Sequence, residues 1–247
     1  MIYKNIALED FVAGFSYFGK LQESFEKSLQ NLLDCAQKDN NEEFQKNLIA
    51  KFLRQNFDYD CNTLGKADLA IYDKDKAKVL FEVKSTHNKA EFVKSPQSLE
   101  SKAFYESILY YLREVHFNKN NNLKHIILCT AHEFYIIKAR EYHALFVANT
   151  DKAIQKRINT AYKNCDFKQG NDTSTARFYT EISQIVEQMQ DRLDFAYVNV
   201  PAILGDNLAE NLGDLSANTN QNLSANANVI DNRTATRERE RERVSAI

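Results

Sequence analysis

Hydrophobic residues recur every three or four positions along the first third of the chain, which is the spacing of amphipathic helices. The stripe over residues 8–33 predicts a first helix, which Gly14 and Gly19 would interrupt. Asn40 and Asn41 precede a second stripe, and either side chain can accept hydrogen bonds from the free N–H groups of a first helical turn. The chain is therefore expected to begin with two helices.

Between residues 66 and 85 the pattern changes to alternation, in the sequence KADLAIYDKDKAKVLFEVKS. This predicts two antiparallel strands joined by the polar turn 74–76. One face of the pair is apolar and is expected to pack on helices; it consists of Leu69, Ile71, Phe81 and Val83. Asp68, Glu82 and Lys84 share the other face, and a three-residue turn would place Asp68 opposite Glu82, with Cβ atoms ~5 Å apart.

Further elements follow this hairpin. Pro96 is expected to start a third helix, because proline is favoured in a first helical turn, and this helix ends at the loop 118–122. Two strands and a last helix are predicted over Leu123–Thr130, Phe134–Lys138 and Tyr179–Leu193, and the strand-like sequence FAYVNV comes next. The order of elements predicts an α/β fold with a mixed central sheet flanked by helices.

The composition changes after Pro201. The last segment is rich in Asn, Ala and Asp, contains no aromatic residue and finishes with RERERER. Such a segment buries too little apolar surface to fold. Residues 1–200 are therefore expected to form one domain, and residues 201–247 a low-complexity, disordered tail.

Composition sets limits on the function. The chain has 247 residues and a net charge of −2, so any DNA binding must come from local clusters of lysine and arginine. No apolar run is long enough to cross a membrane. The four cysteines are scattered without a CxxC motif, which argues against a zinc site and against a disulfide scaffold. These features predict a cytoplasmic protein.

The polar face of the hairpin carries the candidate chemistry. Two carboxylates as close as those of Asp68 and Glu82 repel each other unless a cation lies between them. Mg²⁺ prefers oxygen ligands and often takes only one or two protein carboxylates. Lys84 would reach the same phosphate or water and stabilise charge in the transition state. The alternative is a solvated sheet face on which the acidic side chains pair with lysines.

Six segments extend this pattern into a family resemblance: NEEFQKNLIAKFL, GKADLAIYD, FEVKS, KAFYESILYYLRE, LKHIILCTAHEFYIIKA and FYTEI. Residues 1–200 resemble the N-terminal nuclease module of Type IIG restriction–modification enzymes, in the PD-(D/E)xK superfamily. The resemblance implies a restriction-endonuclease-like core in which Asp68 and Glu82 hold Mg²⁺ and Lys84 serves the attacking water. It also implies a glutamate from the preceding helix, Glu42 or Glu43, of which Glu43 is favoured. Ala67 replaces the proline of the superfamily name.

The function implied by the resemblance is a Mg²⁺-dependent, type II endonuclease module that cuts double-stranded DNA. The Asn-Pro-Pro-aromatic motif of the Type IIG methyltransferase is absent from the sequence, so a separate methyltransferase–specificity polypeptide is the expected partner. The alternative is an inactive remnant or interaction domain that keeps the nuclease fold. Candidate helpers of catalysis on the third helix are Gln97, Lys102, Tyr105 and Glu106. Lys84, Lys89, Lys94 and Lys102 are candidates for a phosphate-contacting edge, and His132 for the cap of a turn.

Overall fold

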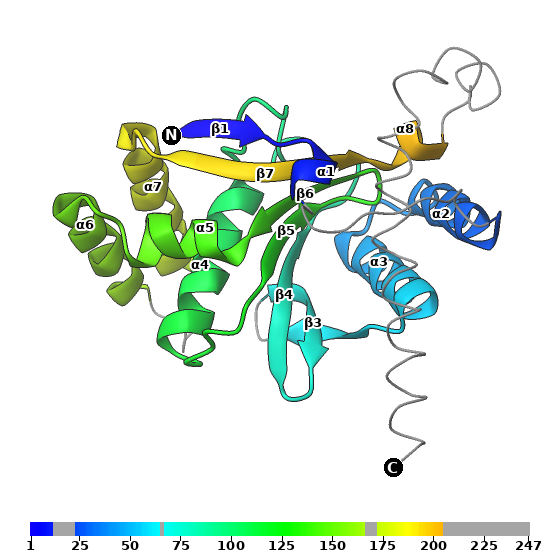
Figure 1. Ribbon diagram of the computed structural model, residues 1–247, viewed down its shortest axis with the longest axis horizontal. Helices are drawn as coiled ribbons and strands as arrows, with labels where there is room; N and C mark the ends of the chain where they lie inside the picture. The colour runs from blue at the N-terminus through cyan, green and yellow to red at the C-terminus, as the bar shows by residue number, and fades with distance from the viewer. Residues whose placement is uncertain (12–22, 65–66, 166–171, 205–247) are drawn as a thin grey trace.

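The computed structural model describes residues 1–11, 23–64, 67–165 and 172–204. Its centre is a mixed seven-stranded sheet in the order β1-β7-β6-β5-β4-β3-β2, with helices on both faces (Figure 1). The strands are β1 (Ile2–Asn5), β2 (Asp60–Leu64), β3 (Ala67–Asp73), β4 (Lys76–Val83), β5 (His125–Cys129), β6 (Glu133–Lys138) and β7 (Arg192–Asn199). The predicted α/β class and mixed sheet are confirmed.

The helices are α1 (Leu8–Phe11), α2 (Glu23–Ala36), α3 (Glu42–Phe57), α4 (Lys102–His116), α5 (Ala139–Tyr142), α6 (Lys152–Lys163), α7 (Asp172–Gln188) and α8 (Val200–Leu204), with a π-helical turn at His143–Val147. The predicted breaks at Gly14 and Gly19 lie outside the described residues. Helix α8 spans the expected start of the tail at residue 201. None of the described helices has the length and apolar character needed to cross a bilayer.

The predicted cap of α3 is confirmed. The side chain of Asn41 accepts hydrogen bonds from the N–H groups of Glu43, at 2.8 Å, and Phe44, at 3.3 Å. These bonds satisfy two of the donors that the first turn of a helix leaves free. They fix where α3 begins, and therefore where its first-turn glutamates lie.

The β3–β4 hairpin has the predicted register, but a shorter turn and a β-bulge produce it in place of the predicted three-residue turn. Asp73 pairs with Lys76, so the turn contains two residues rather than three, and Lys74 adopts the left-handed conformation with φ 58°. A β-bulge then inserts Lys78 as an extra residue on β4. Beyond the bulge, Leu69 pairs with Phe81, and this register places Asp68 across from Glu82.

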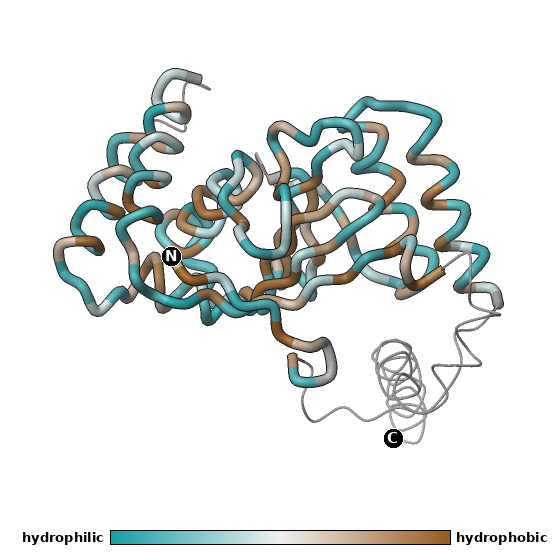
Figure 2. Tube along the Cα trace, turned by 90° about the horizontal axis from the view of Figure 1, so that it is seen from above, coloured by the Kyte–Doolittle hydropathy of each residue, from teal (hydrophilic) through white to brown (hydrophobic). Residues whose placement is uncertain are grey.

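The sheet separates two hydrophobic layers. The face made of Leu69, Ile71, Phe81 and Val83 packs against α2, α3 and α8, as predicted. The opposite face packs against α4, α6 and α7, through Leu80, Ile126 and Leu128 among others. Figure 2 shows hydrophobic segments concentrated in the middle of the body and hydrophilic ones along the outer helices. Glu82, which shares a face of β4 with Leu80, therefore faces α4.

Two predicted helix boundaries are wrong. Helix α4 starts at Lys102 rather than at Pro96, because Ser101 is the N-cap and accepts a hydrogen bond from the Phe104 N–H. The segment before it folds back as a loop, in which the Glu91 carbonyl accepts a hydrogen bond from Ala103 N–H at 3.0 Å. Helix α7 ends at Gln188, so the predicted helix 179–193 runs into β7.

Several elements have no counterpart among the predicted ones: the edge strands β1 and β2, the helices α5, α6 and α8, and the π-helical turn. Helix α6 buries Ile158 and Ala161, and Ile154 and Tyr162 pack against the same core, so its residues have the spacing of an amphipathic helix that sequence reasoning missed.

Candidate active site

The predicted charged residues meet at the carboxyl ends of two parallel neighbours, β4 and β5. Val83 is the last residue of β4 and pairs with Cys129 of β5, and the N–H of Lys84 donates to the Cys129 carbonyl at 2.9 Å. The crossover from β4 to β5 runs through α4, which packs against both strands on one face of the sheet (Figure 1). Side chains from both strands and from the helix can therefore converge there.

Lys84 is the centre of the site. Its side chain is only 5% exposed, and its Nζ lies 2.7 Å from Glu82 Oε1 and 2.8 Å from Glu106 Oε2. A third carboxylate, Glu42 at the start of α3, accepts a hydrogen bond from the same ammonium at 3.4 Å. One buried cation thus joins a strand and the two helices that flank opposite faces of the sheet.

Asp68 completes the cluster from β3. Its Oδ2 accepts a hydrogen bond from the Val83 N–H at 2.9 Å, which fixes the carboxylate beside the end of β4. Burial raises the pKa of Asp68, and this bond and the charge of Lys84 offset only part of the rise. Asp68 therefore lies beside Glu82, as its register on the hairpin requires.

The site holds more negative than positive charge. Burial, followed by the charge of Asp68, raises the pKa of Glu82 well above its ordinary value. Burial also raises the pKa of Glu42. Burial opposes the charge on Lys84, but the carboxylates of Glu82 and Glu106 outweigh this effect and raise the pKa of the ammonium. A further cation would stabilise this arrangement, because close carboxylates repel each other.

Two buried oxygens of the cluster have no hydrogen-bond partner among the described residues, Glu82 Oε2 and Glu106 Oε2. Glu106 Oε2 forms an ion pair with the Lys84 ammonium at 2.8 Å, so Glu82 Oε2 is the one of the two oxygens that has neither an ion pair nor a hydrogen bond among the described residues. A buried carboxylate oxygen without such a bond is costly and is suited to a metal ion.

The fit to a metal ion has one limit. Within the described ranges, no three His, Cys, Asp or Glu side chains form a ready-made metal site, and the ammonium of Lys84 lies among the carboxylates. The oxygen donors of Asp68 and Glu82 fit a hard cation such as Mg²⁺, which can keep most of its water ligands.

The glutamate of α3 that reaches Lys84 is Glu42 rather than the favoured Glu43. The side chain of Glu43 is 64% exposed and forms an ion pair with Lys46 one turn further on. Successive residues of a helix point about 100° apart, so only one of the two glutamates can face Lys84. The cap at Asn41 sets the rotation that brings Glu42 to the site.

Gln45 also shapes the site, and sequence reasoning missed it. It is completely buried, and its Oε1 accepts a hydrogen bond from the Thr86 N–H at 2.9 Å. Its Nε2 donates to the Asp39 carbonyl at 3.0 Å and to the Thr86 hydroxyl at 3.2 Å. These bonds attach the start of α3 to the loop after β4. The available signal was its place four residues before Ile49, on the buried face of α3.

Of the four candidate helpers near α4, the structure brings Glu106 to the cluster. Lys102 forms an ion pair with Glu91 at 2.8 Å, and Gln97 is exposed. Burial, then the charge of Glu100, raises the pKa of Tyr105 to about 12. These three side chains therefore have surroundings that differ from those of Glu106.

The predicted phosphate-contacting edge does not form as one surface. Lys84 is buried, whereas Lys94 is exposed and Lys102 is held by Glu91. Lys89 lies close enough to His132 to lower the pKa of that imidazole, although burial is the larger cause. The turn between β5 and β6 is capped by the Thr130 hydroxyl, which accepts a hydrogen bond from the His132 N–H at 3.1 Å.

Comparison with known proteins adds a family but no activity. No curated protein and no solved structure matches the chain. One family model, described as a domain of unknown function (DUF7149), matches residues 19–225. The match covers most of the described fold and the whole carboxylate cluster, and it extends past residue 204. The chain therefore belongs to the DUF7149 family.

Proposed function

We propose that this protein is a Mg²⁺-dependent endonuclease that hydrolyses phosphodiester bonds of double-stranded DNA. The observation that carries the proposal is the buried ammonium of Lys84, which lies within 3.4 Å of carboxylate oxygens from α3, β4 and α4, with Asp68 of β3 beside them. Four carboxylates around one lysine at the end of a strand are poorly explained by stability alone, since buried charges are costly.

The order of elements supports a restriction-endonuclease-like core. Helix α3 precedes the antiparallel strands β2, β3 and β4, and α4 then crosses over to the parallel strand β5. Asp68, Glu82 and Lys84 occupy the positions that the resemblance to PD-(D/E)xK nucleases assigns to the metal ligands and the lysine. Glu42 is the matching residue on the preceding helix.

In the proposed reaction, Asp68 and Glu82 would hold the metal ion. A bound Mg²⁺ supplies a polarised phosphoryl oxygen and a water of lowered pKa. The ammonium of Lys84 donates hydrogen bonds to the attacking water or to a phosphoryl oxygen, and so stabilises the negative charge that develops there. Glu106 and Glu42 keep Lys84 charged and hold its Nζ in place before substrate arrives.

Selection of a DNA sequence falls, in this proposal, to a separate methyltransferase–specificity polypeptide. The module would then belong to a restriction–modification system and cut alone with little sequence preference. Adding such a polypeptide should convert diffuse nicking of a plasmid into discrete fragments.

A second candidate is a non-enzymatic interaction domain that keeps the nuclease fold. The observation that favours it is that Lys84 already compensates part of the carboxylate charge, and no group of three metal ligands is formed within the described ranges. In that case the cluster would be a structural network that ties α3 and α4 to the sheet.

Plasmid nicking separates these two candidates. The purified chain should nick supercoiled plasmid with Mg²⁺ and not with EDTA, and Asp68→Asn, Glu82→Gln and Lys84→Ala should each remove the activity. Mg²⁺ should also raise the melting temperature of the wild type, because it binds the folded state, and this effect should vanish in Asp68→Asn.

The matched control is Asp73→Asn, at the other end of β3. Asp73 is 64% exposed at the side chain and pairs with Lys78 away from the cluster. The Asp73→Asn variant should nick plasmid as the wild type does. Absence of Mg²⁺-dependent nicking in the wild type, or nicking that survives all three cluster substitutions, would refute the nuclease assignment.

A further inference from the structure

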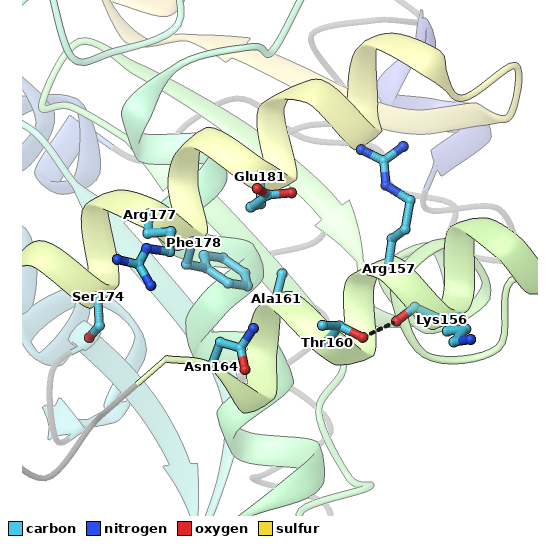
Figure 3. A pocket seen from close by; sticks show the side chains of 9 residues that line it. All are labelled: Lys156, Arg157, Thr160, Ala161, Asn164, Ser174, Arg177, Phe178 and Glu181. Carbon is cyan, nitrogen blue, oxygen red and sulfur yellow. Dashed lines mark hydrogen bonds between the residues drawn. The ribbon is translucent and has the colours of Figure 1, made fainter.

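A groove with a volume of about 280 Å³ lies between α6 and α7, on the side of the sheet that carries α4. Figure 3 shows Arg177 of α7 toward one end of the groove and Arg157 of α6 toward the other. Phe178 and Ala161 lie between the two helices and form an apolar floor. Gln188 accepts a hydrogen bond from Arg157 Nη1, so that guanidinium bridges the two helices.

The lining of this groove is positively charged. Lys156, Arg157 and Arg177 contribute three cations and Glu181 one carboxylate, which leaves two net positive charges. Helix α6 itself contains Lys152, Lys156, Arg157 and Lys163 and no acidic residue. Since the whole chain has a net charge of −2, this concentration of basic side chains is local.

A nuclease whose active site is rich in carboxylates requires a positively charged surface elsewhere to bind DNA. A site with four carboxylates repels phosphate groups, so affinity for DNA must come from lysine and arginine elsewhere. Helix α7 carries Arg177 and Phe178 at the groove and packs against α4, the helix that carries Glu106. The groove and the cluster are therefore connected through two packed helices, α7 and α4.

We propose that the groove between α6 and α7 binds a backbone phosphate of the DNA that the carboxylate cluster cuts. The inference rests on the proposed nuclease function. Arg157 and Arg177 donate hydrogen bonds to phosphate oxygens from the two ends of the groove, and Asn164 adds a polar contact from α6. Glu181 opposes the phosphate and keeps the affinity low.

The test is binding of a short fluorescent duplex to the full chain in EDTA, at several salt concentrations. Arg157→Ala/Arg177→Ala should weaken binding by about tenfold or more, since hydrogen bonds to charged groups are strong. It should also reduce the slope of log K against log salt by about 1 for each phosphate that the variant no longer binds. Glu181→Gln should have the opposite effect and tighten binding.

Lys51→Ala is the matched control. Lys51 is an exposed basic residue on α3, a helix on the other side of the sheet, and its removal should leave duplex binding unchanged. Loss of Arg177 or Lys51 should leave the melting temperature unchanged, because both are exposed, whereas Arg157→Ala also removes the hydrogen bond to Gln188. If the melting temperature falls only in the arginine variant, duplex binding is measured with Lys156→Ala instead, because this substitution removes an exposed side chain of the same groove.

Each remaining outcome decides the proposal. Equal binding by the wild type and the groove variants overturns it, whatever the plasmid assay shows, while nicking that depends on Asp68 keeps the nuclease function. Binding in the groove can also be detected by protection of Arg177 from chemical modification. If a free mononucleotide protects Arg177 and a DNA duplex does not, the assignment of the groove to DNA is overturned.

Discussion

Helix α4 buries two glutamates, Glu106 and Glu114, and the groups around their carboxylates differ in charge: Glu114 faces neutral amides, whereas Glu106 faces a lysine and other carboxylates. Their exposed fractions are similar, 8% and 5%. Both carboxylate oxygens of Glu114 are satisfied by neutral amides: Oε1 accepts a hydrogen bond from Asn118, and Oε2 accepts one from Asn120 at 3.2 Å. Asn120 also donates to the Ala77 carbonyl at 3.0 Å, which ties the loop after α4 to β4.

Glu106 instead shares one cation with other carboxylates. Its Oε2 forms an ion pair with Lys84 Nζ at 2.8 Å, and Lys84 also pairs with Glu82 and Glu42. The difference shows how two buried carboxylates on one helix can have different purposes. A carboxylate bonded by neutral amides stabilises a connection, whereas one that shares a single cation with other carboxylates is typical of a functional site.

The largest expected effect comes from removing the shared cation. Lys84→Met should lower the free energy of unfolding at neutral pH by about 3–5 kcal/mol, because it leaves buried carboxylates without a partner. Burial then keeps more protons on the folded state than on the unfolded state, so stability should fall as the pH rises from about 4. Denaturant unfolding at acidic and neutral pH measures this.

The control for this variant is Lys78→Met, on the same strand. Lys78 pairs with the exposed Asp73 at 3.5 Å, so its loss should cost less than about 1 kcal/mol. Equal losses in both variants would mean that the carboxylates around Lys84 do not depend on its charge.

A pair of substitutions on α4 sharpens the comparison further. Glu114→Gln should lower the free energy of unfolding by about 1–3 kcal/mol, because its new amide group faces the amides of Asn118 and Asn120. Nicking per folded molecule should stay unchanged. Glu106→Gln should reduce nicking by about 10- to 100-fold through loss of Lys84 positioning, with little change in stability. Thermal melts and plasmid nicking of both variants measure these effects. The comparison would be contradicted if Glu106→Gln mainly lost stability and Glu114→Gln mainly lost nicking.

The smallest effect concerns Asp68. Because burial raises its pKa in the folded state, wild-type stability declines as the pH rises through the range in which Asp68 ionises. Asp68→Asn removes this decline. Relative to the wild type, the melting temperature of the variant should therefore rise by a few degrees between pH 4 and pH 7. Adding Mg²⁺ should narrow the difference. A variant that melts below the wild type at pH 7 would show that the charge of Asp68 stabilises the fold through Val83.

Much of the hairpin could be predicted because its causes are local. Period-two alternation assigns Leu69, Ile71, Phe81 and Val83 to one face regardless of what covers it. The cap at Asn41 is equally local, since its side chain bonds the N–H groups two and three residues later. The register of Asp68 and Glu82 was predicted through a turn of the wrong length, and the bulge at Lys78 restored it.

The sequence by itself determined the α/β class, the start of α3, the apolar face of the hairpin and the triad of Asp68, Glu82 and Lys84, because short-range periodicity and capping decide these features. Only the tertiary structure decided that Glu42 and Glu106 join Lys84, that Gln45 holds α3 to the strand end, and that α6 and α7 enclose a basic groove. Those contacts join residues from separate elements. They depend on how each helix is rotated and docked on the sheet, and packing of the whole core sets that rotation.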